Sequence, residues 1–570
     1  MRKVGCLFML LAIGECTSFS QNPPQADFKK LTLEELLDVN VTSVARKAEP
    51  LGRTAAAVTV ITSEDIRRTG VTSIAEALRL VPGMQVARIN ASTWAISARG
   101  FSSQLSDKML VLMDGRTVYS PVFAGVFWEL QDLVLDDIER IEVVRGPGAT
   151  LWGTNAVNGI VNIITKSSHQ TSSTTIVATG GGADSRAIGS VRTGGSLIRD
   201  TSYRVYGKFF DRDQLVLHER GTPAQDNSRF GRAGFRVDSS RPASEITVEG
   251  DAYRGFEGIL AHPDAKFIGG NVMGRWNRRI SNQSSIQVQT SYERLLRRVQ
   301  PNSEIHQRIF DIDLQHQFTI RAHNVTWGAG YRWNNDVTFP MPTLQFIPMR
   351  RTYPLGTAFI QDEISFAQSR LKLQVGSKFE HNDFTGFEIQ PSVRASWAIR
   401  SDEFVWGAVS RAVRTPTRFD TDSNIVAAPL ILSGNKNFKS EDLVAFEFGY
   451  RSRIAPRLFA DLATFFNVYD TLRSSELVTL QPPTVLFLNN LNAKTYGGEL
   501  SASYDALESL RFTAGYSYLV KRLRMEPGHA DFFGNLLEGN DPNHQFFIRA
   551  SADLTRRIEW DSTLRFVGRL

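Results

Sequence analysis

The sequence predicts a mainly β protein, in which a mixed α/β unit of about 120 residues precedes a long run of antiparallel strands. Three observations favour a transmembrane β-barrel for that run. Between about residue 171 and residue 570, many segments alternate apolar and polar residues at every second position. One face of these segments is rich in aromatic residues, whereas the other carries Glu, Arg, Gln and Ser. An export signal at the amino terminus directs the chain out of the cytoplasm.

The composition excludes several classes of protein. The chain has 570 residues, of which 42% are hydrophobic and 22% are charged, so it is neither disordered nor one small domain. Lys and Arg number 65 against 59 Asp and Glu, and the resulting net charge of +6 gives no case for nucleic-acid binding. No run of about 18 consecutive apolar residues is present, which excludes a helical membrane protein. The weaker signal of a β-barrel remains compatible with this composition.

The first twenty residues predict a secretory signal peptide. A basic start precedes a mostly apolar run over residues 4–13, and a small-x-small cleavage pattern ends at Ser20. The alternative is a buried amino-terminal helix. Both cysteines, Cys6 and Cys16, lie in this segment, so we expect the mature chain to lack a disulfide framework, a cysteine metal site and a cysteine nucleophile.

Residues 21–47 are predicted to form a short polar segment. Residues 31–39 suit a brief amphipathic helix, with Thr32 as its cap and Glu35 three residues later. Residues 39–44 contain several β-branched side chains and are expected to be extended.

Residues 48–168 have the mixed pattern of a compact α/β domain. Ser63 and Ser73 are each expected to cap a helix, and Glu64 and Asp65 lie in the first turn, where the helix dipole favours negative charge. The expected strands are 58–62, 109–113, 138–144 and 160–165.

Charged residues on the strands of the 171–570 region favour a barrel over a soluble β-sandwich, which would show the same alternation. In residues 443–451, four large apolar residues alternate with small or charged ones that include Glu447 and Arg451. A charge on the lipid side costs about 2–4 kcal/mol at the bilayer midplane, so these faces must line a wet interior. A closed barrel also leaves no unpaired backbone in lipid. We count about nineteen strand candidates in this exported region.

Several motifs then carry a resemblance to a known family. In the α/β unit they are LRLVPGMQV (78–86), SARGF (97–101), MLVLMDG (109–115) and IERIEVVRGPGATLWGTNAVNGIVNIITK (138–166). In the strand region they are SRAVRTP (410–416), FKSE (438–441), FEFGY (446–450) and AKTYGGE (493–499). This set closely resembles the plug domain and barrel of TonB-dependent outer-membrane receptors, over about residues 39–570.

The resemblance implies a gated importer in the cell outer membrane, with the α/β unit as a plug in the lumen of a barrel of about 22 strands. Because our count is about nineteen, and because an even number is expected, we predict a barrel that is incomplete at its carboxyl end and unable to close. In this family the energy-transducing protein TonB of the inner membrane pulls on a TonB box, which pairs with it as an added strand and must be exposed and extended. The expected box is Val39, Asn40, Val41, Thr42, Ser43 and Val44, and the alternative for this segment is the first strand of the plug.

Two further groups of residues are expected to matter. The resemblance implies a charge cluster between plug and wall, formed by Arg99, Arg145, Glu447 and Glu499; the alternative for the two carboxylates is a solvated lumen face. Plug apices that mix aromatic residues with arginine suit a flat anionic chelate, and the alternative is packing in the plug core. The candidate ligand-binding residues are Arg88, Trp94, Arg116, Tyr119, Phe123 and Trp128.

The sequence therefore predicts an importer of a scarce small-molecule ligand, with a ferric siderophore or another metal chelate favoured. Cobalamin, haem, peptides and glycans stay open as ligands, and a passive porin or adhesin is the alternative from another class. No nucleophile, base and orienting group occur together, so we expect no enzymatic activity, no resident cofactor and no metal site.

Overall fold

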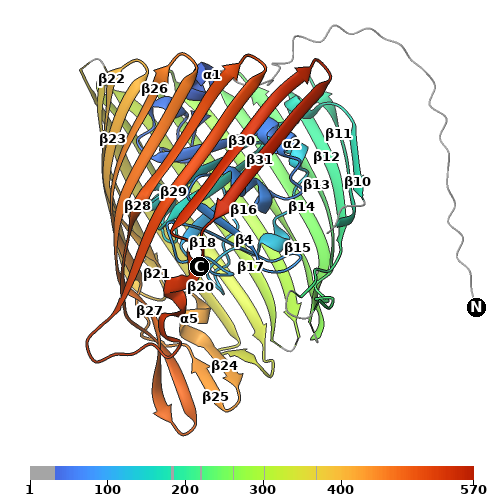
Figure 1. The fold of residues 1–570 in the computed structure, drawn as a ribbon, viewed down its shortest axis with the longest axis vertical. Helices are drawn as coiled ribbons and strands as arrows, with labels where there is room; N and C mark the ends of the chain where they lie inside the picture. Colours follow the sequence, from blue (N-terminus) through green and yellow to red (C-terminus); the bar gives the residue numbers. More distant parts are fainter. Residues whose placement is uncertain (1–32, 181–184, 218–220, 261, 301, 368) are drawn as a thin grey trace, which may run out of the picture.

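The computed structural model describes residues 33–570, apart from residues 181–184, 218–220, 261, 301 and 368. The predicted signal peptide, residues 1–20, and the proposed cap Thr32 lie outside the described residues. Figure 1 shows an α/β unit, coloured blue, enclosed by long tilted strands of one large sheet. No helix in the described part of the chain is both long and apolar enough to cross a membrane.

The α/β unit is built on a five-stranded sheet in the order β3-β8-β9-β6-β7, with a separate β4–β5 hairpin. Its helices are α1 (Leu33–Asp38), α2 (Ser63–Thr69), α3 (Ile74–Ala77) and α4 (Ala149–Trp152), and its 3-10 helices are η1 (Leu51–Arg53), η2 (Leu78–Leu80), η3 (Trp128–Leu130), η4 (Leu135–Asp137) and η5 (Ser168–Thr171). Its strands are β1 (Asn40–Val41), β2 (Glu49–Pro50), β3 (Ala57–Thr62), β4 (Met84–Arg88), β5 (Trp94–Ala98), β6 (Met109–Met113), β7 (Arg116–Thr117), β8 (Ile138–Arg145) and β9 (Gly159–Thr165). The four predicted strands are β3, β6, β8 and β9, each within one residue of its predicted ends.

Local capping explains where the helices begin. Thr62, and not the predicted Ser63, caps α2, because its side chain accepts from the backbone N–H of Asp65 while the Asp65 carboxylate accepts from the backbone N–H of Thr62. Ser73 caps α3 as predicted, by accepting from the N–H of Glu76. Gly70, at φ +64°, ends α2 in the left-handed conformation that favours glycine.

The strand region forms one sheet of twenty-two strands in sequence order, from β10 to β31. Its strands are β10 (Thr175–Gly180), β11 (Ser185–Ile198), β12 (Thr201–Arg212), β13 (Ser228–Arg241), β14 (Ser244–Ile259), β15 (His262–Ser281), β16 (Ser284–Val299), β17 (Ser303–Ile320), β18 (His323–Phe339), β19 (Leu344–Phe346), β20 (Arg350–Phe366), β21 (Leu371–Asn382), β22 (Gly386–Arg400), β23 (Glu403–Arg414), β24 (Ser423–Ala427), β25 (Leu430–Ser433), β26 (Glu441–Ala455), β27 (Leu458–Leu480), β28 (Pro483–Leu507), β29 (Leu510–Met525), β30 (His544–Thr555) and β31 (Ile558–Val567). The connections also hold α5 (Arg418–Asp422) and η6 (Gly534–Asn540).

Nineteen of these strands build the wall in the described part of the chain, because β19, β24 and β25 are short strands of the long connections. The predicted number of wall strands is therefore confirmed. β10 and β31 are the two edge strands, and no register among the described residues joins them.

The two faces of the wall differ as the alternation predicts. Val409, Phe446, Phe466 and Tyr496 are paired across β23, β26, β27 and β28, and each is between 39% and 47% exposed on the outer surface. Such a row of aromatic and apolar side chains suits a lipid environment. Glu447, the neighbour of Phe446, points into the lumen and is buried.

The two ends of the barrel also differ. In Figure 1, α1 and α2 lie near the end where short turns join the strands, whereas α5, β24 and β25 lie at the opposite end, with the long connections. Helices α1 and α2 and the long connections therefore lie at opposite ends of the barrel.

Candidate functional site

The predicted charge cluster lies deep between the plug and the wall. Arg99 Nη1 is 2.8 Å from Glu447 Oε1, and Arg99 Nε is 3.3 Å from Glu499 Oε1. Arg145 Nη1 lies 3.4 Å from Glu499 Oε2, and all four side chains are at most 4% exposed. Burial lowers the pKa of Arg99, but Glu499 and Glu447 more than offset that effect, so its pKa is raised and the guanidinium stays charged.

Two glycines of the plug make room for these carboxylates. Gly146 (φ +107°) and Gly83 (φ +77°) have backbone conformations that favour glycine. A Cβ on Gly83 would lie 2.7 Å from Glu499 Oε1, and a Cβ on Gly146 would collide with the carboxylate of Glu447. The glycines of the RGP and VPG motifs therefore allow the wall carboxylates to approach the plug backbone.

A second ionic network, nearer the long connections, joins the plug to the wall. Lys108 Nζ of the plug lies 2.6 Å from Glu441 Oε2. Arg414, which is fully buried, lies 2.7 Å from Glu441, 2.9 Å from Asp420 of α5 and 3.2 Å from Asp107 of the plug. The SRAVRTP and FKSE motifs supply Arg414 and Glu441, so the sequence singled out both residues without indicating their shared role.

The candidate TonB box is folded against the plug, which corrects the expectation that it is exposed and extended. Asn40 and Val41 form β1, which pairs with β2, and the chain then turns. The Glu142 carboxylate, fully buried on β8, accepts from the N–H groups of Thr42 and Ser43 at 2.8 Å each and from Ser43 Oγ at 2.6 Å. A short polar segment close to a buried carboxylate gains more from these charge-assisted bonds than from staying extended in water.

The residues after the box contact the wall. Arg46 Nη1 lies 2.9 Å from Asp313 Oδ1 on β17, and Gln315 Nε2 donates to the Arg46 carbonyl at 3.0 Å. Lys47 Nζ lies 2.9 Å from Glu363 on β20. The segment therefore holds the plug on one side and the barrel wall on the other.

Most of the candidate ligand-binding residues lie within the plug. Trp94 and Trp128, at 3% and 8% exposure, belong to its main apolar core, and Tyr119 donates to the Asp107 carbonyl at 3.0 Å. Arg116 forms an ion pair with Glu293, and Arg88 donates to the Ala91 carbonyl at 2.7 Å; their positions fit the packing alternative. The sequence alone does not separate residues that contact a ligand from residues that pack inside the plug, because buried and exposed aromatic residues in loops have the same local sequence pattern.

Phe123 is the candidate that reaches the long connections. Its ring lies against those of Phe127, Phe346 and Phe419, at centroid distances of 5.8 to 6.0 Å. Arg473 lies over Phe487 at 5.4 Å and 3.0 Å from Asp420, and its side chain is 34% exposed. This combination of aromatic faces and a partly exposed cation suits a planar anionic ligand.

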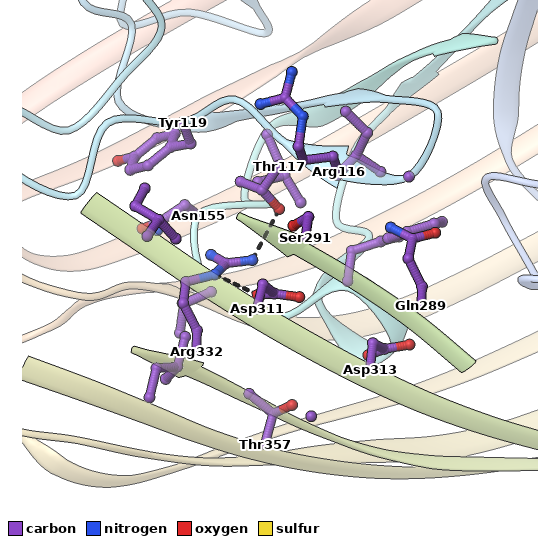
Figure 2. A pocket seen from close by; sticks show the side chains of 18 of the residues that line it. Arg116, Thr117, Tyr119, Asn155, Gln289, Ser291, Asp311, Asp313, Arg332 and Thr357 are labelled. Atoms are coloured by element: carbon purple, nitrogen blue, oxygen red, sulfur yellow. Dashed lines mark hydrogen bonds and ion pairs between the residues drawn. The ribbon is translucent and has the colours of Figure 1, made fainter. Parts of the chain in front are cut away.

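A polar cavity of about 400 Å³ lies between the plug and the wall. Figure 2 shows Thr117 of the plug facing Arg332 and Asp311 of the wall, whereas the Arg116 guanidinium points away from these two residues. Arg332 binds Asp311 Oδ2 at 2.6 Å and Thr117 Oγ1 at 3.1 Å. Gln287, Gln289, Ser291 and Glu293 of β16 line this side of the cavity, and their alternation with apolar residues is a sequence signal that could have located it.

Comparisons with known proteins agree with this architecture. The family model of the TonB-dependent receptor plug domain matches residues 50–160, and the model of the TonB-dependent receptor-like β-barrel matches residues 166–569. The iron-regulated outer membrane virulence protein of Vibrio cholerae is 24% identical, over 93% of this chain and 84% of that protein. The vitamin B12 transporter of Vibrio vulnificus is 22% identical, over 82% of this chain and 75% of that protein.

Solved structures show the same fold. The ferric enterobactin receptor of Pseudomonas aeruginosa superposes with a TM-score of 0.75 at 17% identity, over 90% of this chain and 86% of that one. The siderophore receptor PirA of the same species gives a TM-score of 0.71 at 18% identity, over 90% and 91% of the two chains. Together, the matched plug, the matched barrel and the enclosed architecture show that this chain belongs to the TonB-dependent receptor family of the cell outer membrane.

Proposed function

We propose that this receptor imports a ferric siderophore or another metal chelate, using energy that TonB delivers to residues 39–44. The observation that carries this proposal is the plug itself, which lies inside the barrel and is held there by buried ion pairs. A plug held in this way opposes passive diffusion, so uptake requires work on the plug. This argues against a passive porin or adhesin.

The relatives favour iron as the cargo, and so do the aromatic rings beside Arg473 near the long connections. The relatives and the solved structures of the same fold include an iron-regulated protein, a ferric enterobactin receptor and a siderophore receptor. Arg473 and the rings of Phe123, Phe419 and Phe487 offer stacking and positive charge, which suit a planar anionic chelate. A cobalamin is the second candidate, because a vitamin B12 transporter is also among the relatives.

TonB is the proposed partner at the opposite end of the plug. Its strand would pair with residues 39–44, which must first leave Glu142 and β2. The folded segment is then a resting state, and the exposed, extended segment is the form that binds TonB. Haem, peptides and glycans remain alternatives for the ligand.

The test is energised uptake of radioactive iron chelates by cells that lack other receptors of this kind. We expect uptake of at least one ferric chelate that needs both this chain and TonB. Proline at Val41 and Thr42 should abolish uptake while leaving ligand binding at the surface intact, because proline removes backbone donors from an added strand. Uptake of cyanocobalamin with no uptake of iron would transfer the assignment to the second candidate.

A further inference from the structure

The turns at one end of the barrel carry a repeated arginine. In the described part of the chain, nine turns join neighbouring wall strands at the end that holds α1 and α2 (Figure 1). Eight of these turns have an exposed arginine within the turn or directly beside it. We call these residues the arginine collar. They are Arg199, Arg241, Arg279, Arg321, Arg370, Arg400, Arg457 and Arg557.

Most arginines of the collar have no carboxylate partner. Arg400 lies 3.7 Å from Glu403, and the other seven form no ion pair with any residue that the structure describes. By contrast, Arg229 at the opposite end of the wall has a side chain that is 51% exposed, and it binds Asp211 at 2.6 Å. A row of unpaired cations repels itself, so an anionic partner would stabilise the collar.

Large apolar side chains adjoin the collar on the outer surface of the wall. In six of the eight turns, the residue directly next to the arginine is an isoleucine or leucine that is 36% to 66% exposed. These residues are Ile198, Ile280, Ile320, Leu371, Ile399 and Ile558. Trp276, Trp397 and Trp560 are 42% to 52% exposed, and each is three residues from a collar arginine. Exposed tryptophans mark the boundary between hydrocarbon and water, so the collar lies at the level of the lipid headgroups.

We propose that the collar binds the phosphate groups of anionic phospholipids in the inner leaflet of the outer membrane. The short turns of outer-membrane barrels face the periplasm, which places the collar in that leaflet. A guanidinium group presents a planar fork of N–H donors that matches two oxygens of one phosphate. The adjacent isoleucine or leucine contacts the acyl chain of the same lipid. A soluble anion, or an anionic polymer of the cell wall, would satisfy the arginine alone.

The spacing of the turns lets neighbouring arginines act together. Arg279 and Arg321 belong to consecutive turns, β15–β16 and β17–β18, which are two strands apart. Two strand spacings amount to about 10 Å. The Debye length at physiological ionic strength is about 8 Å, so the fields of consecutive turns overlap. Lipid binding should therefore weaken as the salt concentration rises.

The opposite end of the wall supplies a matched set of control residues. Arg186, Arg229 and Arg298 have side chains that are 47% to 53% exposed, and each forms an ion pair of 2.6 Å with an aspartate or glutamate. Replacing these three arginines removes as much positive charge as replacing three arginines of the collar. The two triple variants therefore have the same net charge and differ in which arginines they lose.

The experiment counts the lipids that the purified full chain retains from detergent micelles, by native mass spectrometry. The micelles contain either dioleoyl phosphatidylglycerol or dioleoyl phosphatidylcholine, which have the same acyl chains. We expect the unsubstituted chain to retain at least three times more phosphatidylglycerol. Combining Arg279→Gln, Arg321→Gln and Arg370→Gln should lower this retention by at least a third, because three of the eight arginines are lost. Glutamine at the three control positions should lower it by less than a tenth.

Two results of this experiment would overturn the proposal. Equal losses in the two triple variants would mean that net charge alone attracts the lipid. Equal retention of the two lipids by the unsubstituted chain would mean that the collar does not recognise an anionic headgroup. Lysine at the three collar positions should keep most of the retention, because the charge remains.

A second measurement separates phospholipid from the cell wall as the partner. Ile280→Ser combined with Ile320→Ser keeps every arginine but removes two apolar contacts, and it should lower retention of phosphatidylglycerol measurably. Binding of the full chain to purified peptidoglycan sacculi is measured by sedimentation. A triple collar variant that keeps its phosphatidylglycerol but no longer binds sacculi would assign the collar to the cell wall and refute the lipid proposal. None of these results depends on which ligand is imported, so this test can fail while the proposed function stands.

Discussion

The interior of the plug and its interface with the wall are held together by different forces. Inside, Ile74, Val111, Ile141 and Val161 form a continuous core with exposures of 0%. At the interface, the contacts are ion pairs such as Arg99 with Glu447 and Lys108 with Glu441. Burial of apolar side chains makes the plug unfold as one cooperative unit. The ion pairs with the wall, in contrast, can be replaced by contacts with water or with other charged groups. The difference fits a plug that stays folded while its contacts with the wall are rearranged.

The largest effect is expected inside the core. Trp94→Ala should lower the free energy of unfolding of the plug by about 3–5 kcal/mol, because Trp94 is 3% exposed and its loss leaves a cavity. Thermal unfolding of the purified protein measures this loss. If Trp94 served ligand binding instead of packing, the variant would keep its stability and lose affinity.

Breaking the charge cluster comes next. Glu447→Gln should weaken the attachment of the plug to the wall by about 3 kcal/mol. This is the lower end of the range for breaking a buried pair, because Glu499 still faces Arg99. The plug should become more accessible to protease while its own unfolding transition is retained. A change in plug unfolding as large as that of Trp94→Ala would break the distinction between core and interface.

A smaller, local effect is expected at the folded TonB box. Glu142→Gln removes the charged acceptor for Thr42 and Ser43, which is worth about 1.5–3 kcal/mol. Amide hydrogen exchange at these two residues should then accelerate by about ten- to a hundredfold, while β8 stays protected. Unchanged exchange would show that β1 pairing alone holds the segment.

The smallest effect is expected at an exposed pair of the interface. Arg67 of α2 binds Glu559 of β31 at 2.6 Å, but its side chain is 51% exposed. Arg67→Ala should therefore change the free energy of unfolding by less than about 1 kcal/mol, as judged by the same thermal measurement. A larger loss would mean that burial does not rank the ionic contacts of this interface.

Local pattern in the sequence was enough for the strands of the wall and for four of the plug strands, because period-two alternation depends on neighbouring residues alone. It missed the β4–β5 hairpin and placed the cap of α2 one residue late. The four residues proposed as a charge cluster followed from the family resemblance, and the structure places their side chains together.

The mainly β architecture, the two-part organisation and the polar and apolar faces of the strands can all be predicted from the amino-acid sequence. The contact of Thr42 with Glu142, the ion pair of Arg46 with Asp313, and the cavity between the plug and strands β15 to β21 all depend on the tertiary structure. These contacts join residues 100 and 267 positions apart. No local pattern specifies such partners, because they meet only after the plug is enclosed by the wall.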